Sequence, residues 1–203
     1  RYGNVSPCRI ALWALVALAL IGFGLLLIRG PGAAPASGDA QVTIGGPFTL
    51  IGTDGRPFSS AQLNDKPYAI FFGFTHCPDV CPTTLARLSK LRTQLNQGPE
   101  PFRIVFVTVD PERDTPAEMA SYASLFPTPV VALTGSPAQI EQVKKQFKVF
   151  SQKVPDESGG YSVDHTATVL LFGRDGKFVS TIAPEEGDSR AIDEVKRIAA
   201  GLS

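Results

Sequence analysis

The sequence has few residues that bind transition metals or form disulfide bonds, with three cysteines and two histidines among 203 residues. A small secreted domain held together by disulfides would need more cysteines at longer separations, so that class is excluded. Basic and acidic side chains number 19 each, which leaves no excess positive charge of the kind that marks nucleic-acid binding. We therefore expect no nucleic-acid partner, and we look for chemistry at a few individual side chains.

Long hydrophobic runs are also rare, and one stands out at residues 10–28, which carry no charged side chain. A helix of this length rises about 28 Å, close to the ~30 Å hydrocarbon core of a bilayer. The run therefore predicts a single-pass transmembrane anchor after a short flank, residues 1–9. A cleaved secretory signal is the alternative, although its apolar region is usually shorter, and the AAPAS stretch after Arg29 is compatible with cleavage. Arg1 and Arg9 before the run favour a cytoplasmic N-terminus.

Residues 29–41 combine Gly, Pro, Ala and Ser without apolar periodicity, which predicts a flexible linker. The globular domain is then expected to span residues 42–203. A chain with 43% hydrophobic and 19% charged residues suits one core plus an appendage better than two full domains. With the N-terminus in the cytoplasm, this domain would face the periplasm or an equivalent compartment.

Apolar patterning in residues 42–203 predicts strands that alternate with helices. The expected order is a hairpin at the Asp54-Gly55 step, a buried strand in KPYAIFFGFT, a helix through Leu85–Leu95, a strand in FRIVFVTVD, a helix capped by Thr115, a strand in TPVVALT, a helix capped by Ser136, a hairpin in ATVLLFGRDGKFVSTIA and a helix over 188–201. Such alternation implies right-handed crossovers and a parallel centre, with an antiparallel edge. The fold class is therefore α/β, a mixed sheet flanked by helices.

Two cysteines, Cys77 and Cys81, are four residues apart in FGFTHCPDVCPTTL, between a predicted strand and a predicted helix. Unpaired N–H groups at a helix start favour negative charge, so both thiols are expected to ionise more readily than free cysteine. Soft sulfur ligands select Cu(I), whereas a structural disulfide across so short a loop would add little constraint. Pro78 and Pro82 each offer a start for the helix. The third cysteine, Cys8, precedes the apolar run and is expected to be inert or acylated.

The two histidines receive different interpretations. His165 lies in YSVDHTATVLLF just before a predicted strand, at the edge where a parallel sheet gathers its functional loops. Spacing alone favours neither interpretation of His165, as a metal ligand or as an ordinary histidine, because a lone histidine is a weak signal of a metal site. We interpret His76 as a surface or core residue, since its neighbour Cys77 would crowd it as a ligand.

Three segments together resemble the Sco/SenC family of copper proteins: FFGFTHCPDVCPTTL, VTVDPERDTP and YSVDHTATVLLF, in the same order and after one hydrophobic run. The resemblance covers nearly everything from about Val42 onward, and it implies a thioredoxin-like fold. It places the two copper thiolates of the family on Cys77 and Cys81 and its histidine ligand on His165. The implied cofactor is one copper ion, Cu(I) or Cu(II).

The same resemblance implies a role and a location. It implies a metallochaperone, not an enzyme, that delivers copper to the copper-containing subunit of cytochrome c oxidase, with other copper carriers or thiol reductases as further partners. Cys77 and Cys81 would also form a redox-active disulfide, which cannot bind metal. The implied location is the bacterial inner membrane with the domain in the periplasm, and the mitochondrial inner membrane is the alternative. Asp79 and Asp164 flank the ligands and are expected to be solvated carboxylates more than orienting groups.

Rival functions remain open from the sequence. Thiol-disulfide oxidoreductases of the same fold usually carry CxxC and a cis-proline loop, whereas this chain has CxxxC and VDHTAT. A copper or redox sensor would use the same site, and nothing in the sequence separates sensing from delivery. A structural zinc site is disfavoured because there are three candidate ligands and no fourth.

Overall fold

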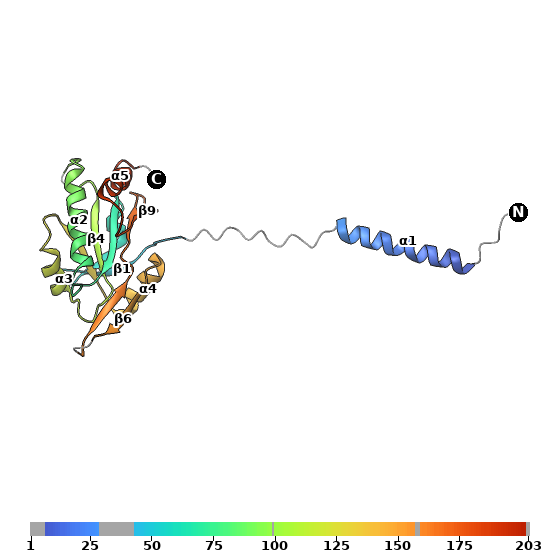
Figure 1. The fold of residues 1–203 in the computed structure, drawn as a ribbon, viewed down its shortest axis with the longest axis horizontal. Coiled ribbons are helices and arrows are strands. Elements are labelled where there is room, and N and C mark those ends of the chain that lie inside the picture. Colours follow the sequence, from blue (N-terminus) through green and yellow to red (C-terminus); the bar gives the residue numbers. More distant parts are fainter. Residues whose placement is uncertain (1–6, 29–42, 99, 157–158, 202–203) are drawn as a thin grey trace. The chain divides into compact units, whose positions relative to one another are not determined.

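The computed structural model describes residues 7–28, 43–98, 100–156 and 159–201 (Figure 1). The chain divides after residue 42 into two compact units, each described by itself. In the first, helix α1 runs from Pro7 to Ile28, and its described side chains are mostly exposed. A search of the described residues finds no helix with the length and apolarity needed to cross a membrane. The anchor at 10–28 stays a prediction, and the linker at 29–41 lies outside the described residues.

The second unit contains a seven-stranded mixed sheet with the order β2-β1-β5-β4-β3-β8-β9. Its strands are β1 (Thr49–Gly52), β2 (Pro57–Ser59), β3 (Tyr68–Gly73), β4 (Arg103–Thr108), β5 (Val130–Thr134), β8 (Val169–Phe172) and β9 (Phe178–Ile182). Strands β3, β4 and β5 are parallel, while β1 and β8 pair antiparallel on either side of them. This confirms the predicted parallel centre and the two hairpins, and antiparallel strands lie on both sides of that centre, where one antiparallel edge was predicted.

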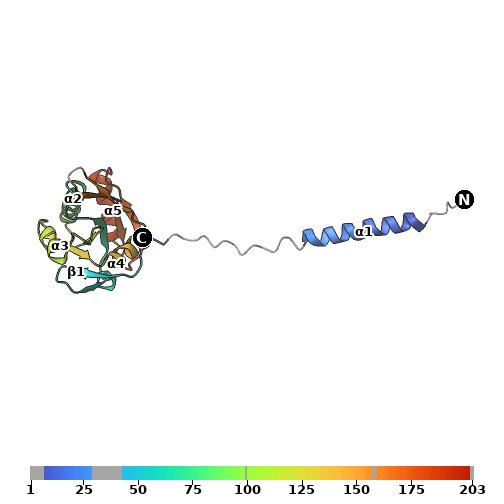
Figure 2. The ribbon, with the colours of Figure 1, turned by 90° about the horizontal axis from the view of Figure 1, so that it is seen from below.

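Four α-helices and one short 3-10 helix accompany this sheet: η1 (Ser60–Leu63), α2 (Val80–Gln94), α3 (Pro116–Ala123), α4 (Pro137–Phe147) and α5 (Asp188–Ala199). Thr115 caps α3 and Ser136 forms a capping box with Gln139 at α4, as the sequence predicts. Helices α2 and α5 lie side by side in both views, where Arg87 of α2 pairs with Asp188 of α5 (Figures 1 and 2). The helices therefore flank the sheet as expected.

The core lies around β3, all six of whose residues are buried. Its largest fully buried members are aromatic: Phe71, Phe72, Phe102, Phe106, Phe147 and Phe172. A strand covered on both faces needs such a continuous apolar run. Because β3 is central and fixed on both sides, the segment that follows Gly73 starts from a rigid point.

A second, two-stranded sheet is formed by β6 (Ser151–Pro155) and β7 (Tyr161–His165), and the sequence did not predict it. The strands pair antiparallel, with Ser151 opposite His165. Most of their side chains are at least partly exposed, so the alternation of apolar and polar residues that reveals a half-buried strand is weak. His165 is consequently the last residue of a strand, four residues before β8 begins.

Candidate metal centre

The cysteine segment forms the connection between β3 and α2. The amide of Cys77 donates to the Phe74 carbonyl at 3.2 Å, and the amide of Cys81 points at Cys77 Sγ at 3.4 Å. Helix α2 begins at Val80, between the two prolines considered as starts, so Pro82 occupies its third position. A proline is tolerated there because the first helical N–H groups have no partner within the helix. This start places Cys77 just before the first turn of α2 and Cys81 within it.

Three potential metal ligands converge although His165 is 84 residues from Cys81 along the chain. Their ligand atoms, two Sγ atoms and one imidazole nitrogen, all lie within 4.8 Å of one another. Cys81 Sγ and His165 Nε2 are 3.4 Å apart. Two sulfurs and a nitrogen at this spacing form a donor set that suits copper.

The orientation of His165 leaves Nε2 available to a metal. Its Nδ1 lies 3.1 Å from the Thr166 carbonyl, to which a protonated Nδ1 donates. Phe71 and Phe74 contact the imidazole edge-on, with ring centroids 5.9 and 5.8 Å away. Burial lowers the pKa of His165, although the Thr166 carbonyl and the charge of Asp164 oppose this. The ring is therefore neutral near pH 7, which is the form that binds metal.

The Cys81 thiol departs from the expectation that both thiols ionise readily. Cys81 is completely buried, and this burial raises the pKa of its thiol, with a smaller upward effect from Cys77. A backbone hydrogen bond with Phe74 opposes the rise and is outweighed. The prediction from the helix start is thus wrong for Cys81, because loss of hydration dominates. Metal binding at Cys81 must displace a proton.

Comparison with known proteins identifies this arrangement. A family model described as SCO1/SenC matches residues 36–200. The chain belongs to the SCO1/SenC family. A SCO2-like protein of Rickettsia conorii is 37% identical over 176 residues, which cover 81% of this chain and 85% of that protein. The resemblance noted in the three sequence segments is confirmed.

Solved structures of the family share the fold. ScoI of Bradyrhizobium japonicum, solved with copper bound, is 42% identical and has a TM-score of 0.69, covering 76% of this chain and 99% of its own. BsSco, a member of the Sco family of cytochrome c oxidase assembly proteins in which a disulfide switch was identified, is 28% identical with a TM-score of 0.59. It covers 78% of this chain and 94% of its own. A homologous structure thus binds copper, and this SCO1/SenC chain has a Cys-Cys-His group that could bind it.

Gly73, the last residue of β3, allows Cys81 to pack closely against the sheet. A Cβ at this position would lie 2.6 Å from Cys81 Sγ and 2.9 Å from the Phe106 ring. Both distances are below van der Waals contact, and Phe106 is itself fully buried. The thiol can therefore occupy its place only because residue 73 has no side chain.

We expect Gly73→Ala to weaken copper binding and to lower the free energy of unfolding by about 1–3 kcal/mol, the usual cost of overpacking a core. Copper retention after dialysis and thermal unfolding would measure the two effects. The matched control is Gly187→Ala, where a Cβ meets nothing within 4 Å and the expected cost stays below about 1 kcal/mol. Full copper retention by Gly73→Ala would show that the thiol position is not constrained from this side.

The other polar residues near the ligands lie as the sequence indicated. The His76 side chain is 51% exposed, and its Nδ1 is 3.0 Å from Thr75 Oγ1, outside the ligand group. Asp79 is exposed at the start of α2 and accepts from Thr83 Oγ1 at 3.2 Å. Asp164 is exposed on β7. These side chains border the site, and none belongs to the Cys-Cys-His group.

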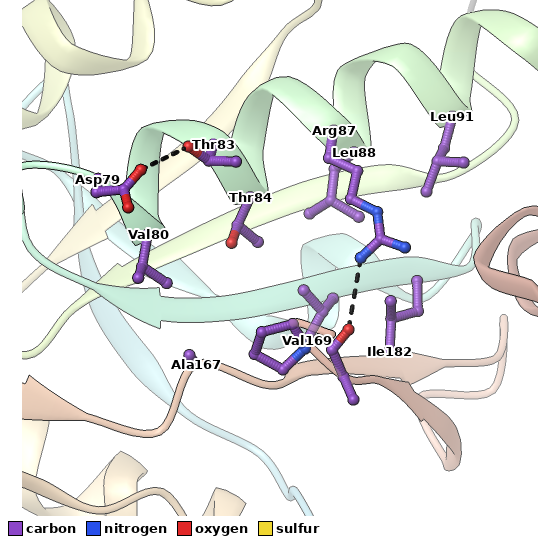
Figure 3. A pocket seen from close by; sticks show the side chains of 12 residues that line it. Asp79, Val80, Thr83, Thr84, Arg87, Leu88, Leu91, Ala167, Val169 and Ile182 are labelled. Carbon is purple, nitrogen blue, oxygen red and sulfur yellow. Dashed lines mark hydrogen bonds between the residues drawn. The ribbon is translucent and has the colours of Figure 1, made fainter. Parts of the chain in front are cut away.

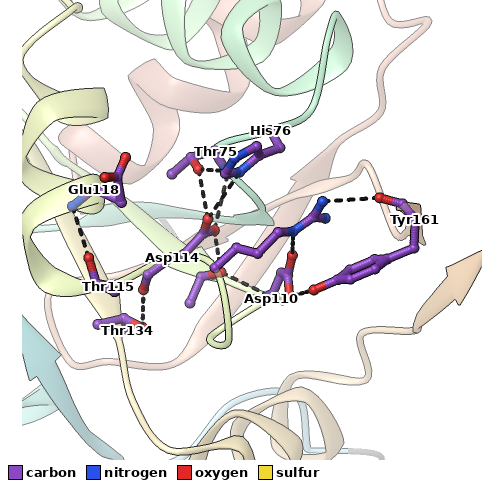
Figure 4. A network of polar contacts seen from close by, with 10 residues as sticks. Thr75, His76, Asp110, Asp114, Thr115, Glu118, Thr134 and Tyr161 are labelled. Atoms are coloured by element: carbon purple, nitrogen blue, oxygen red, sulfur yellow. Dashed lines mark hydrogen bonds and ion pairs between the residues drawn. The ribbon is translucent and has the colours of Figure 1, made fainter. Parts of the chain in front are cut away.

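Sequence reasoning missed the role of the VDPERDTP segment, although it quoted the segment as a family motif. Asp114 is fully buried and accepts from the Thr75 amide at 3.1 Å, Thr75 Oγ1 at 2.7 Å and Thr108 Oγ1 at 2.6 Å (Figure 4). Because Thr75 is two residues before Cys77, Asp114 fixes the cysteine loop to the end of β4. The available signal was that the predicted strand FRIVFVTVD leads directly into acidic residues. A carboxylate that is buried at the end of a strand needs hydrogen-bond donors around it.

A groove of about 210 Å³ follows α2 away from the cysteine loop (Figure 3). Its walls include Val80 and Leu88 of α2 and Val169 and Ile182 of the sheet. Arg87 crosses it to reach the Ala183 carbonyl at 3.4 Å. The lining contains no cysteine or histidine, so the groove contributes no soft ligand to the metal centre.

Proposed function

We propose that this SCO1/SenC protein binds one copper ion through Cys77, Cys81 and His165 and delivers it to the dinuclear copper centre of cytochrome c oxidase during assembly. The observation that carries the proposal is the convergence of three ligand atoms within 4.8 Å, with Nε2 of His165 directed at Cys81. A centre with three ligands accepts Cu(I) and leaves room for a ligand from an acceptor protein.

The unequal burial of the ligands supports transfer over permanent storage. Cys81 is completely buried, whereas Cys77 and His165 are partly exposed. An incoming ligand would therefore replace Cys77 or His165 first, and the buried sulfur would release the ion last. Such stepwise replacement lets copper move between proteins without passing through free solution.

Membrane attachment is part of the proposal. The apolar run at 10–28 would anchor the chain, residues 29–41 would act as the linker, and the domain at 42–203 would face the periplasm from the bacterial inner membrane. The mitochondrial inner membrane facing the intermembrane space is the equivalent alternative. The anchor would keep the copper site near the membrane in which the oxidase subunit resides.

Thiol redox chemistry is a second candidate function, and one observation favours it. Cys77 and Cys81 are both free thiols within the same group of ligand atoms. We propose that a thiol reductase converts the Cys77–Cys81 disulfide, which does not bind copper, into the dithiol that does. The two electrons and two protons come from the dithiol of the reductase, which itself becomes a disulfide. A disulfide switch was identified in BsSco, which supports the same chemistry here.

The test is deletion of the chain from its cell, followed by measurement of cytochrome c oxidase activity. We expect activity to fall, to recover on addition of copper salts or the wild-type chain, and not to recover with His165→Ala. The purified wild-type protein should contain about one copper ion and reduce insulin slowly. Normal oxidase activity in the deletion strain would favour a sensor, whereas rapid insulin reduction without bound copper would favour an oxidoreductase.

A further inference from the structure

The β6–β7 hairpin carries His165 at one end of β7 and Tyr161 at the other. We propose that Tyr161, fixed by Arg113 and Asp110, is a positioning residue that sets how long His165 stays on the metal. The inference rests on the proposed copper site, and it adds a residue that controls how the third ligand, His165, binds. It gives a role to the ion pair of Arg113 with the buried Asp110, neither of which belongs to the metal-ligand group.

Tyr161 is attached to the body of the domain through its hydroxyl, its ring and its backbone. Its hydroxyl donates to Asp110 Oδ1 at 3.0 Å, and its carbonyl accepts from Arg113 Nη1 at 3.0 Å (Figure 4). The Arg113 guanidinium lies 3.9 Å from the ring centroid, and Lys153 Nζ lies 4.6 Å from it. Asp110 is fully buried and forms an ion pair with Arg113, so hydroxyl and guanidinium meet the same carboxylate. Hydrogen bonds to an ionised partner are the stronger kind.

The hairpin needs these attachments because it belongs to neither edge of the main sheet. It forms a separate sheet of two strands, and such a hairpin alone is marginally stable in water. Val163 is the one side chain of its described residues that is buried in the core. At the far end, Thr166 and Phe150 exchange two hydrogen bonds of 3.0 Å. Tyr161 therefore provides a polar attachment, beside the ion pair of Lys153 with Glu112 at 2.6 Å, for the hairpin that presents His165.

Arg113 also connects this attachment to the imidazole. Its guanidinium lies 5.7 Å from the Phe74 ring centroid, and Phe74 contacts His165 edge-on. The two sulfurs, in contrast, are carried by the connection from β3 to α2 and do not depend on the hairpin. Loosening Tyr161 should thus affect the nitrogen ligand while the sulfur ligands keep their geometry.

The experiment compares Tyr161→Ala and Tyr161→Phe with the wild-type chain. Release of Cu(I) to excess bathocuproine disulfonate should be about tenfold faster in Tyr161→Ala, in the range typical of lost supporting contacts around a metal ligand. Tyr161→Phe keeps the ring that Arg113 and Lys153 contact, and it should show an intermediate rate. Electron paramagnetic resonance of the Cu(II) form should show weakened nitrogen coupling in Tyr161→Ala, with about one copper still bound.

Tyr68→Phe is the matched control, because it also removes a phenolic hydroxyl. Tyr68 is the first residue of β3, at the end of that strand away from the cysteine loop. It should leave both the release rate and the nitrogen coupling unchanged. Wild-type release and coupling in Tyr161→Ala would overturn the inference, even if the variant were less stable to heat. A wild-type chain that binds no copper would overturn the proposed function as well, so the two failures are distinguishable.

Discussion

Replacing Cys81 with alanine is expected to remove nearly all copper binding. The buried sulfur of Cys81 lies 3.4 Å from His165 Nε2, and Cys81 is the one fully buried member of the ligand group. Its loss leaves one sulfur and one nitrogen, and the apparent affinity for Cu(I) should fall by more than about a hundredfold. Contacts that merely support a ligand already change metal affinity about 10- to 100-fold. Copper content after competition with a chelator would measure the loss.

The control for this variant is Cys8→Ala, which removes the one cysteine outside the predicted site and should retain full copper binding. His165→Ala should lose most Cu(II), whereas it should lose less Cu(I), because the two sulfurs dominate binding of the softer ion. Equal copper content in Cys81→Ala and the wild-type chain would contradict the assignment of the site.

The pH dependence of copper binding provides an independent check on Cys81. The pKa of its thiol is raised by burial, so near neutral pH copper must displace its proton. Below that pKa, the proton that Cys81 loses to copper contributes a rise of about tenfold in apparent affinity for each unit of increasing pH. His165 has a lowered pKa and is already neutral near pH 7, so it adds to this slope only in more acidic solution. Chelator competition at several pH values would measure this slope, and a copper affinity that does not rise with pH near neutrality would contradict the assignment of Cys81 as a ligand.

The parallel centre of the fold was predictable because its signals are strong. Strand β3 is buried along its whole length and reads as a continuous apolar run, while Thr115 and Ser136 mark helix starts by known capping patterns. The β6–β7 hairpin was not predictable in the same way. Its pairing depends on Tyr161 and Val163 meeting the body of the domain, and such long-range contacts leave little local pattern.

In the candidate site, too, one part was predictable from the sequence and another part was not. Sequence spacing brought Cys77 and Cys81 to one loop, and the family resemblance, more than any local pattern, selected His165. The ionisation of Cys81 was predicted wrongly because the helix start is visible in the sequence, whereas the depth of burial is not. The roles of Asp110 and Asp114 were missed for the same reason, since an acidic residue is usually exposed unless it is paired.

Asp114 connects these observations, because this one buried residue ties together the cysteine loop, the end of β4 and β5. Its oxygens accept from Thr75 in the cysteine loop and from Thr108 at the end of β4, and its backbone carbonyl accepts from Thr134 Oγ1 of β5 at 2.7 Å. Without the carboxylate, the Thr75 amide and the Thr108 hydroxyl would lose their acceptor, and the Thr75 hydroxyl would keep only His76 Nδ1 as a partner. Buried donors without acceptors cost free energy individually, so their losses accumulate.

We therefore expect Asp114→Ala to lower the free energy of unfolding by about 3 kcal/mol or more, with a fall in Tm of about 10 °C. Because Thr75 is released two residues before Cys77, copper binding should weaken beyond what the loss of stability explains. The matched control is Asp193→Ala on α5, whose carboxylate is 73% exposed and pairs with Lys196, and it should change stability by less than about 0.5 kcal/mol. Thermal unfolding with and without copper would separate the two effects. A wild-type Tm in Asp114→Ala would mean that water or another acceptor satisfies the threonine hydroxyls, and that the cysteine loop is positioned by its contacts with Phe74 and Gly73 alone.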